Sequence, residues 1–401
     1  MTNQRRKKKI LYISQAFPFP ADSGGKIKTF YTLRTLARKY IVYALFVSDR
    51  IPAANEVRAV TRLGVAVTIT YSPGILYSVK NNLLGLARHY LRGIPQYVFQ
   101  YTDASAFYQA NRLVHELKPD VIHIDHLNMS QYLPEEKKQR WILEHHNVET
   151  YLYWTRFVHT GKITRKLYLF MEMLLTYVYE FRTLRRFDHV FTISKPEEER
   201  AKRMFFVHNV STQPLVYPGL HLTKRRHKGK RILFIGTLGW PPNEDAIEWF
   251  VHKIFPLIRR IVPNAEFHVV GRPGPRYAPP GSDHIILHGF QINLDSYLST
   301  ADVFVLPFHM GGGLRLKALM ALSVGLPVVT TALGVDGLNV RNGKECLIAQ
   351  DAKGFAREAV RLMMSAHLRR KFGQRAREYV RLHHGQEKNR EFLRIYKQVI
   401  E

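Results

Sequence analysis

Residues Pro307 to Thr331 read PFHMGGGLRLKALMALSVGLPVVTT, and an apolar run of strand type, Val303 to Leu306, stands directly before them. Three glycines, Gly311 to Gly313, are followed by residues with the apolar spacing of a helix. A second apolar run, Val328 to Thr331, ends the stretch. A strand, a glycine loop, a helix and another strand form one unit of a parallel α/β sheet.

The glycine loop predicts an anion-binding site at the start of this helix. Backbone N–H groups at a helix N-terminus have no partner within the helix, and the helix dipole adds positive charge there. Arg315 and Lys317 stand in the first turn, where cations oppose the dipole unless an anion lies between them and the loop. The same residues also fit a tight turn followed by two solvated basic side chains. This stretch alone leaves both interpretations open.

Strand patterns alternate with helix patterns along the whole chain, which favours parallel sheets covered by helices. Two such sheets in series predict an α/β protein with two Rossmann-like domains that face a central cleft. The strands expected in the first half are Ile10 to Ser14, Ile41 to Val47, Val65 to Tyr71, Asp120 to Asp125, Trp141 to Glu144 and His189 to Ile193. Those expected in the second half are Arg231 to Gly236, Phe267 to Gly271, Ile285 to Leu287, Val303 to Leu306, Val328 to Thr331 and Cys346 to Ile348. Helices are expected at Asn55 to Leu63, Lys162 to Phe187, Ala352 to Met364, His367 to Leu382 and Glu387 to Ile400.

Composition limits the class of protein. A length of 401 residues favours two domains, and a hydrophobic content of 46% is enough for real cores. The single cysteine, Cys346, excludes an internal disulfide and a cysteine-based metal site, and it reads as a small buried residue. The net charge of +28 predicts a polyanionic neighbour: a nucleic acid, an anionic membrane or an acidic glycolipid.

Two features bear on membranes. No apolar run reaches the roughly 18 residues of a spanning helix, and the apolar run after Arg5 to Lys9 is too short for a signal peptide. Tyr77 to Arg92 is amphipathic, basic and aromatic, so it fits a membrane-interface helix as well as an ordinary helix whose apolar side is core. In Lys162 to Phe187, by contrast, the apolar spacing is that of ordinary core. The residues with this spacing are Leu167, Phe170, Leu174, Tyr177 and Phe181.

Taken together, the motifs resemble the GT-B glycosyltransferases of family 4, and more closely the sugar transferases of bacterial exopolysaccharide clusters. In the first half the resemblance rests on PFPADSGGKIKTF near the start, DVIHIDH (Asp120 to His126), LEHHNVE (Leu143 to Glu149) and RFDHVFTISKPEEER. In the second half it rests on ILFIGTLGWPPNEDAIEWF and on ADVFVLPF followed by GGGLRLKALMALSVGLPVVTT. The likeness covers nearly the whole chain, and its strength lies in the order and spacing of the motifs.

The resemblance implies that the two domains bind different substrates. Residues 1–222 would bind the acceptor, residues 223–385 would bind a nucleotide-diphosphate sugar, and residues 386–401 would form a helix that crosses back to the first domain. It implies a retaining hexosyltransferase that acts on a glycan or lipid-linked acceptor in surface polysaccharide synthesis. Neither a metal nor another cofactor is expected, and the sequence has no Asp-X-Asp motif. The expected place is cytoplasmic, peripheral at the anionic inner face of the cytoplasmic membrane, with no specific nucleic-acid partner.

The resemblance also assigns site residues. Arg315 and Lys317 would stabilise the negative charge that grows on the leaving diphosphate. Asp125 would hydrogen-bond a sugar hydroxyl or act as a base, and these alternatives stay open. The expected catalytic residues are Asp125, His126, His146, Arg315 and Lys317. The expected donor-binding residues are Gly24, Gly25, Gly271, Arg272, Gly289, Phe290, Gly311, Gly312, Gly313, Arg315, Lys317 and Met320. The expected acceptor-binding residues are Gly25, His123, Asp125 and His146.

The chain departs from the family pattern at the donor site. The family's paired glutamates fall on Gly312 and Met320, and its basic pair is replaced by GTLGWPPN, Gly236 to Asn243. Donor binding would therefore depend more on Arg315 and Lys317. Two rival functions follow: another enzyme on this fold, such as an epimerase, or a non-catalytic GT-B-like protein that binds polyanions or membranes. The first would need acidic pairs in the cleft, which the sequence lacks.

Overall fold

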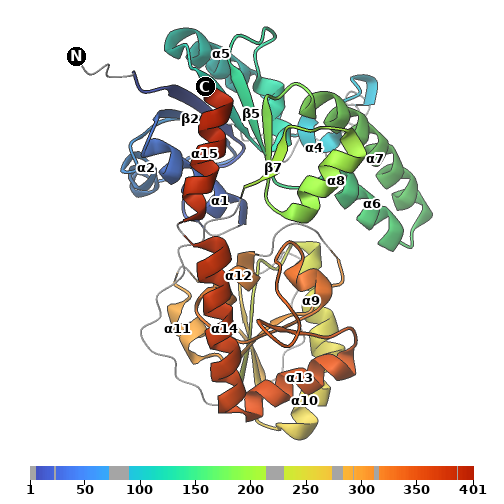
Figure 1. Cartoon of the computed structure of the whole chain (residues 1–401). Coiled ribbons are helices and arrows are strands. Elements are labelled where there is room, and N and C mark those ends of the chain that lie inside the picture. Colours follow the sequence, from blue (N-terminus) through green and yellow to red (C-terminus); the bar gives the residue numbers. More distant parts are fainter. Residues whose placement is uncertain are drawn as a thin grey trace. The chain divides into compact units, whose positions relative to one another are not determined.

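The computed structural model describes residues 6–21, 24–71, 90–213, 230–272, 283–291, 293–310, 316–385 and 387–401 (Figure 1). The chain forms two compact units. One consists of Met1–Leu215 and Asn389–Glu401, and the other of Val216–Lys388. Each unit has its own parallel sheet, which confirms the predicted pair of Rossmann-like α/β domains.

The first sheet has seven strands in the order β3-β2-β1-β4-β5-β6-β7, and every neighbouring pair is parallel. The chain moves outward from β1 to β3 and then returns to the other side of β1 as β4. This reversal makes the ends of β1 and β4 a topological switch point, where open α/β sheets bind ligands. The strands are β1 (Lys9–Ser14), β2 (Ile41–Ser48), β3 (Val65–Tyr71), β4 (Val121–Asp125), β5 (Arg140–His145), β6 (His189–Thr192) and β7 (Val210–Thr212).

Helices cover both faces of this sheet, because strand residues alternate between the two sides. Leu11 and Ile13 belong to one buried cluster, and Ile10 and Tyr12 to the other. The second cluster also contains Phe392 and Tyr396 of the last helix, so α15 is part of the core of the first unit (Figure 1). The helices of this unit are α1 (Gly24–Ala37), α2 (Ala54–Thr61), α4 (Gln96–Phe99), α5 (Ala104–Leu117), η1 (Leu127–Tyr132), α6 (Glu149–His159), α7 (Ile163–Leu184), α8 (Lys195–Phe205) and α15 (Lys388–Ile400).

The second sheet has six parallel strands in the order β10-β9-β8-β11-β12-β13, with its switch point between β8 and β11. Cys346 is fully buried as expected, and burial raises its pKa to about 12. The strands are β8 (Arg231–Ile235), β9 (Glu266–Val270), β10 (Ile285–Leu287), β11 (Val303–Leu306), β12 (Val328–Thr330) and β13 (Leu347–Ile348). The helices are α9 (Pro241–Trp249), η2 (Phe250–Ile254), α10 (Phe255–Ile261), α11 (Asp295–Thr300), α12 (Leu316–Ser323), η3 (Ala332–Val335), α13 (Ala352–Met364) and α14 (Ala366–His384).

Helix α7 corrects one expectation from the sequence. Tyr177 and Phe181 pack against the core, but Leu167, Phe170 and Leu174 are exposed. The side of α7 that is buried carries Leu169 and Leu184 together with the polar residues Glu172, Thr176, Glu180 and Thr183. The prediction that these three apolar residues are core was therefore wrong. Backbone N–H groups of neighbouring segments need the carboxylates of α7 as hydrogen-bond acceptors, so the polar side of the helix is buried instead.

Most of the amphipathic stretch Tyr77 to Arg92 lies outside the described residues, since residues 72–89 are not among them. The two interpretations of that stretch therefore remain as the sequence left them. Among the helices that the structure describes, none has the length and apolar character needed to cross a bilayer.

Candidate functional site

Three polar side chains form a row across the ends of β1, β4 and β5. The strand register places Ser14 beside Asp125, and Asp125 beside Glu144. All three are buried, with at most 1% of their surface exposed. Residues far apart in the sequence therefore meet at the first switch point, directly beneath the start of α1.

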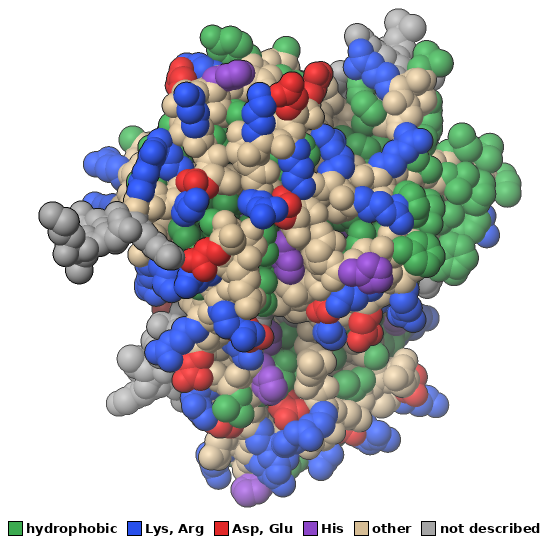
Figure 2. All heavy atoms as spheres, turned by 45° about the horizontal axis from the view of Figure 1, so that its top comes forward, with side chains coloured by type: hydrophobic (Ala, Val, Ile, Leu, Met, Phe, Trp, Pro, Cys, Tyr) green, Lys and Arg blue, Asp and Glu red, His purple; other side chains and the backbone are tan. Residues whose placement is uncertain are grey.

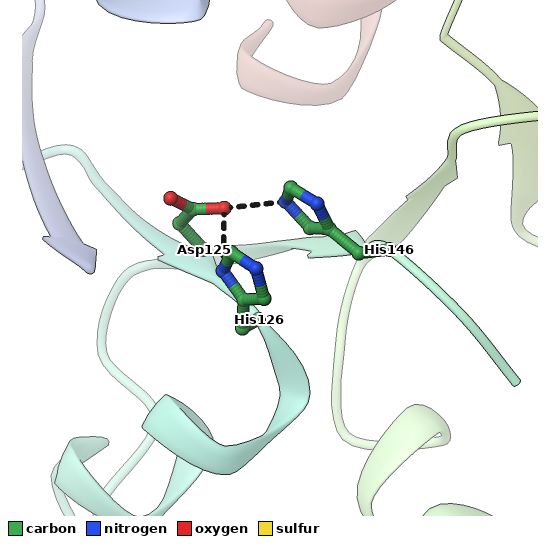
Figure 3. A group of neighbouring side chains, drawn as sticks. All are labelled: Asp125, His126 and His146. Carbon is green, nitrogen blue, oxygen red and sulfur yellow. Dashed lines mark hydrogen bonds and ion pairs between the residues drawn. The ribbon is translucent and has the colours of Figure 1, made fainter. Parts of the chain in front are cut away.

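Asp125 is the centre of this row. One carboxylate oxygen, Oδ1, lies 2.7 Å from His146 Nε2 and 3.1 Å from His126 Nδ1 (Figure 3). The other oxygen, Oδ2, accepts hydrogen bonds from Ser14 Oγ at 2.8 Å and from Thr29 Oγ1 at 2.6 Å. The two imidazole rings stack, with centroids 3.7 Å apart. We call Ser14, Thr29, Asp125, His126 and His146 the switch-point cluster.

The charges within the cluster follow from these contacts. Burial alone would raise the pKa of Asp125, but the two histidines outweigh burial and hold this pKa well below its usual range. Burial disfavours a charged His126, yet the Asp125 carboxylate raises its pKa above the ordinary value. Burial and the neighbouring His126 lower the pKa of His146. The cluster therefore favours an anionic Asp125, and it favours a proton on His126 over a proton on His146.

His126 also has an unusual backbone. Its φ of +75° lies in the region that favours glycine. Holding a residue with a side chain in that region lowers the stability of the fold by on the order of 1–3 kcal/mol. The backbone N–H of His126 donates to the carbonyl oxygen of Glu144 at 3.1 Å, which helps to hold the strained turn after β4. The turn brings the ring of His126 over that of His146 (Figure 3). Strain of this kind clusters at functional sites, so it supports a functional role for His126.

Gly25 borders the exposed edge of His126. Gly24 and Gly25 are the first residues of α1, and a Cβ added to Gly25 would lie 3.5 Å from His126 Nε2. The His126 side chain keeps 19% of its surface exposed, whereas Asp125 has none. The absence of a side chain at Gly25 therefore leaves one imidazole nitrogen open to a ligand.

A second layer of polar groups lies beneath the cluster. Glu144 pairs with Lys28 Nζ at 2.9 Å, and His123 Nε2 lies 3.4 Å from it. Although burial alone would raise the pKa of Glu144, Lys28 and His123 bring it down to about 2. His123 stacks on Tyr12 and also contacts Tyr396. His123 was expected to bind the acceptor, but the structure places it in this fully buried layer, where it supports Glu144.

The switch-point cluster has the spacing of a metal site. Asp125, His126 and His146 each offer a ligand atom, and these atoms lie within 4.8 Å of one another. Metal ligands must be deprotonated, and Asp125 favours the protonated form of His126. A metal would therefore have to displace a stabilised proton.

The second switch point holds Lys317, in the first turn of α12. Its Nζ donates a hydrogen bond to Asn243 Oδ1 at 2.7 Å and lies about 5 Å from the ring centres of Phe234 and Phe308. A Cβ on Gly236, which follows β8, would come within 2.7 Å of this ammonium group. We call Phe234, Asn243, Phe308 and Lys317 the lysine site. It places the ammonium group of Lys317 in an aromatic frame at the ends of β8 and β11.

The glycines predicted to bind the donor have distinct surroundings. A Cβ on Gly271 would lie 1.9 Å from the carbonyl oxygen of Gly236, so the close approach of these two strand ends requires glycine. The Gly271 N–H donates to the carbonyl oxygen of Gly289, whose φ is +65°. Arg272 lies over the ring of Phe290, 5.1 Å from its centre. These four predicted donor residues therefore stand together at the ends of β9 and β10.

For the remaining predicted donor-binding residues the structure gives less information. Gly311, Gly312, Gly313 and Arg315 lie outside the described residues. Met320 is described and is 9% exposed on α12. The roles assigned to all these residues remain predictions.

Sequence reasoning overlooked several polar residues that the structure brings to the two sites. Lys28 and Thr29 lie in the quoted GGKIKT stretch. Glu144 lies in LEHH, where a charged residue at the end of a buried strand was the available signal. The members missed in the first unit are Ser14, Lys28, Thr29 and Glu144, and Asn243 is missed in the second.

Comparison with known proteins supports the resemblance inferred from the motifs. Residues 229–365 match the family model described as glycosyl transferases group 1. An uncharacterized 44.6 kDa protein in the cps region of Klebsiella pneumoniae is 24% identical over 371 residues, which cover 88% of this chain and 90% of that protein. The narrower assignment to family 4 stays a prediction.

Solved structures of low sequence identity share the fold. A sucrose-phosphate synthase from Thermosynechococcus elongatus is 18% identical, with a TM-score of 0.69 over 98% of this chain and 99% of that one. A mutant of S. aureus TarM in complex with fondaparinux, alpha-GlcNAc-glycerol and UDP is 10% identical, with a TM-score of 0.68 over 98% and 100%. Anabaena HepE in complex with UDP-glucose is 10% identical, with a TM-score of 0.63 over 97% and 99%. The chain therefore has the GT-B fold.

Proposed function

Because residues 229–365 are a glycosyltransferase group 1 domain, we propose that the chain transfers a sugar from a nucleotide-diphosphate donor to a glycan or lipid-linked acceptor. The relative from a cps region supports bacterial surface polysaccharide synthesis as the setting. The observation that carries the proposal is Lys317, a cation held by Asn243 at the switch point of the second sheet.

On the donor side, Lys317 binds the diphosphate, and Arg315 contributes a second cation. The bond between the anomeric carbon and the diphosphate oxygen breaks, and its electron pair leaves with the diphosphate. The fixed ammonium group stabilises this growing negative charge, so no proton has to reach the leaving group first. The acceptor hydroxyl forms the new bond on the same face of the sugar and gives its proton to the leaving diphosphate oxygen. The sugar thereby retains its configuration.

On the acceptor side, the switch-point cluster orients a sugar hydroxyl. The protonated His126 donates through its open nitrogen beside Gly25, while Asp125 fixes the ring and its charge. No step in this scheme needs a metal, and we propose that transfer proceeds in the presence of a chelator. We further propose that the enzyme acts at the inner face of the cytoplasmic membrane, where a lipid-linked acceptor would be found.

One observation favours a second candidate, a GT-B-like protein without catalysis that binds polyanions. The positions at which the family has its glutamate pair are Gly312 and Met320, and neither side chain accepts a hydrogen bond from a ribose hydroxyl. Such a protein would bind anionic glycans or vesicles without binding a nucleotide diphosphate.

Calorimetry of the purified chain against UDP, GDP and ADP, with EDTA present, separates the two candidates. UDP comes first, because the TarM and HepE structures were solved with UDP or UDP-glucose. We expect one diphosphate to bind, and Lys317→Ala to weaken its binding about 10- to 100-fold, the usual range for a hydrogen bond to a charged group. Lys253→Ala, which removes an exposed lysine of η2, is the matched control and should leave the affinity unchanged.

Three results would each count against one part of the proposal. If none of the three diphosphates binds to the wild type, the non-catalytic candidate is favoured. If Lys317→Ala binds as tightly as the wild type, the lysine site is not where the diphosphate lies. Binding that disappears when EDTA is added would contradict the metal-free scheme.

A further inference from the structure

Helix α7 has its polar side buried and an apolar side exposed. On the buried side, Glu172 accepts a hydrogen bond from the backbone N–H of Gln96 at 2.9 Å. Glu180 accepts from the backbone N–H groups of Glu149 and Thr150, which begin α6, and contacts His145 Nε2 at 3.1 Å. Each carboxylate therefore caps backbone donors that would otherwise be unsatisfied. These contacts fix the rotation of α7 about its own axis.

This rotation turns a continuous apolar stripe outward. Leu167 has 66% of its surface exposed and Ile163 has 78%. The stripe follows the spacing of one helix face and spans about 22 Å, at about 1.5 Å per residue. Figure 2 shows it as a green area at the right of the molecule, over α6 and α7. We call these exposed residues the apolar face: Ile163, Leu167, Phe170, Met171, Leu174 and Val178 of α7, with Trp154 and Val158 of α6.

Charge around the apolar face has one sign. In residues 149–184 the carboxylates are Glu149, Glu172 and Glu180, and the last two are completely buried. Exposed cations stand at both ends of α7, with Lys162 directly before the stripe and Arg182 and Arg185 after it. Apolar patches of this kind on a protein surface mark interaction sites. An apolar stripe with cations at both ends fits a surface that is apolar inside and anionic outside.

We propose that the apolar face docks on the surface of an anionic lipid bilayer. The apolar side chains would enter the boundary between headgroups and acyl chains, with α7 parallel to the membrane plane. Lys162, Arg182 and Arg185 would contact anionic headgroups, and each of these contacts strengthens binding at low salt. This inference deepens the proposed function, since it gives the transferase a route to a lipid-linked acceptor.

A second copy of the chain fits this face less well. Whether a two-fold axis makes the two helices run parallel or antiparallel, the cations at the ends of one α7 lie close to the cations at the ends of the other. Like charges opposed in this way cost binding energy, and the described part of α6 and α7 offers no fully exposed carboxylate to offset them. A bilayer with anionic headgroups complements both ends at once.

The docking face is tied to the candidate acceptor site through Glu180. This carboxylate contacts His145, the neighbour of His146 in the switch-point cluster, and also caps α6. The contacts run through buried groups, so α7 and the cluster belong to one rigid part of the first unit. Docking through the apolar face would therefore hold the cluster at a constant distance from the membrane surface.

Vesicle co-sedimentation of the full chain tests this inference, without donor or nucleotide. The probes are vesicles of phosphatidylcholine alone and vesicles with 30% phosphatidylglycerol. We expect binding to the anionic vesicles that weakens with salt. The triple variant Leu167→Ser/Phe170→Ser/Leu174→Ser should lose at least about tenfold in affinity, because three apolar side chains no longer leave water. The variant Lys162→Gln/Arg182→Gln should bind more weakly and depend less on salt.

The matched control, Ile51→Ser/Tyr108→Ser/Leu382→Ser, removes three exposed apolar side chains from outside α6 and α7 and should bind like the wild type. Circular dichroism checks that each variant is folded. Equal binding by the wild type and the α7 triple variant would overturn the inference, as would a wild type that binds neither kind of vesicle. A wild-type dimer in sedimentation equilibrium that the α7 variant converts to a monomer would assign the face to a second copy instead. Diphosphate binding is measured separately, so failure of docking and failure of the transferase proposal are distinguishable.

Discussion

The two switch points of the molecule carry different kinds of site. At the first, Asp125 is completely buried and its two oxygens contact four side chains from β1, α1 and the turns after β4 and β5. At the second, Lys317 donates a hydrogen bond to Asn243 at 2.7 Å and lies about 5 Å from the centres of two aromatic rings. The same sheet topology thus supports a buried polar network in one unit and a lysine framed by aromatic rings in the other.

The difference separates two ways of holding charge. A buried carboxylate must be compensated by its neighbours at all times, so its contacts contribute to the stability of the fold. A lysine near the surface tolerates weaker compensation and remains available for an anionic ligand. We therefore expect substitutions in the first site to act on both folding and function, and those in the second to act mainly on ligand binding.

The largest effect is expected from removing the central carboxylate. Asp125→Ala leaves His126, His146, Ser14 and Thr29 without their shared partner, and breaking a buried pair usually costs about 3–5 kcal/mol. We expect a loss of that size in the free energy of unfolding, measured with urea at pH 7. Lys317→Ala should cost less, about 1–2 kcal/mol, since a partly exposed ammonium group loses less than a completely buried carboxylate when its contacts are removed.

Equal losses of stability in the two variants would remove the distinction between the sites. Asp125→Asn refines the test, because the amide keeps the shape of the side chain but not its charge. Should this variant fold normally yet bind acceptor poorly, the charge that raises the pKa of His126 matters for function rather than for folding.

A smaller effect concerns pH at the edge of the first site, where Glu149 begins α6. Burial and the nearby Glu180 raise the pKa of Glu149 to about 7. A carboxyl with a raised pKa in the folded state stabilises the fold below its unfolded pKa of about 4.3, and this contribution is lost as the pH rises toward 7. Glu149→Gln removes the titration. Its stability relative to the wild type should therefore increase between pH 5 and pH 8, by on the order of 1–3 kcal/mol.

Urea unfolding of both proteins at the two pH values measures this difference. Lys253→Ala, which is far from any of these carboxyls in the sequence, serves as the control and should show the same pH dependence as the wild type. A constant difference between wild type and Glu149→Gln would mean that Glu149 ionises normally in the folded protein.

The smallest change in stability is expected at Gly25. A Cβ there would meet His126 Nε2 at 3.5 Å, an ordinary van der Waals contact, so Gly25→Ala should stay within about 0.5 kcal/mol of the wild type. The added methyl group would nevertheless cover the open nitrogen of His126. Acceptor affinity should fall several-fold while diphosphate binding stays unchanged. Unchanged kinetics with every acceptor would argue that His126 does not contact the acceptor.

The sequence predicted the regular elements well where their pattern is local. The strand at Ile285 to Leu287 and the helix at Ala352 to Met364 have the predicted bounds, because periodicity and flanking turns are properties of neighbouring residues. The strand β7 (Val210–Thr212) was missed, since its sequence, VST, has one apolar residue and therefore forms no apolar run. Helix α7 was predicted, but the wrong side of it was expected to be buried. The spacing of apolar residues shows that a helix has an apolar side, and it does not show whether that side faces the core or the solvent.

At the sites, the sequence identified Asp125, His126 and His146 as residues at strand ends, and it signalled Glu144 only as a charged residue at the end of a buried strand. It did not show that Ser14, Lys28 and Glu144 lie beside them. That neighbourhood depends on the pairing of β4 with β5 and with β1, which is more than 100 residues away in the sequence. In the second unit, GGGLRLK marked Lys317, but its acceptor Asn243 comes from a different helix.

The residues alone predicted two parallel α/β sheets and a helix N-terminus with cations in its first turn. These depend on apolar periodicity and on glycine, which act over a few residues. Tertiary structure alone decided which charges meet and which side of α7 faces water. The reason is that both depend on satisfying buried donors and acceptors, and the partners of Asp125, Glu172 and Glu180 come from distant parts of the chain.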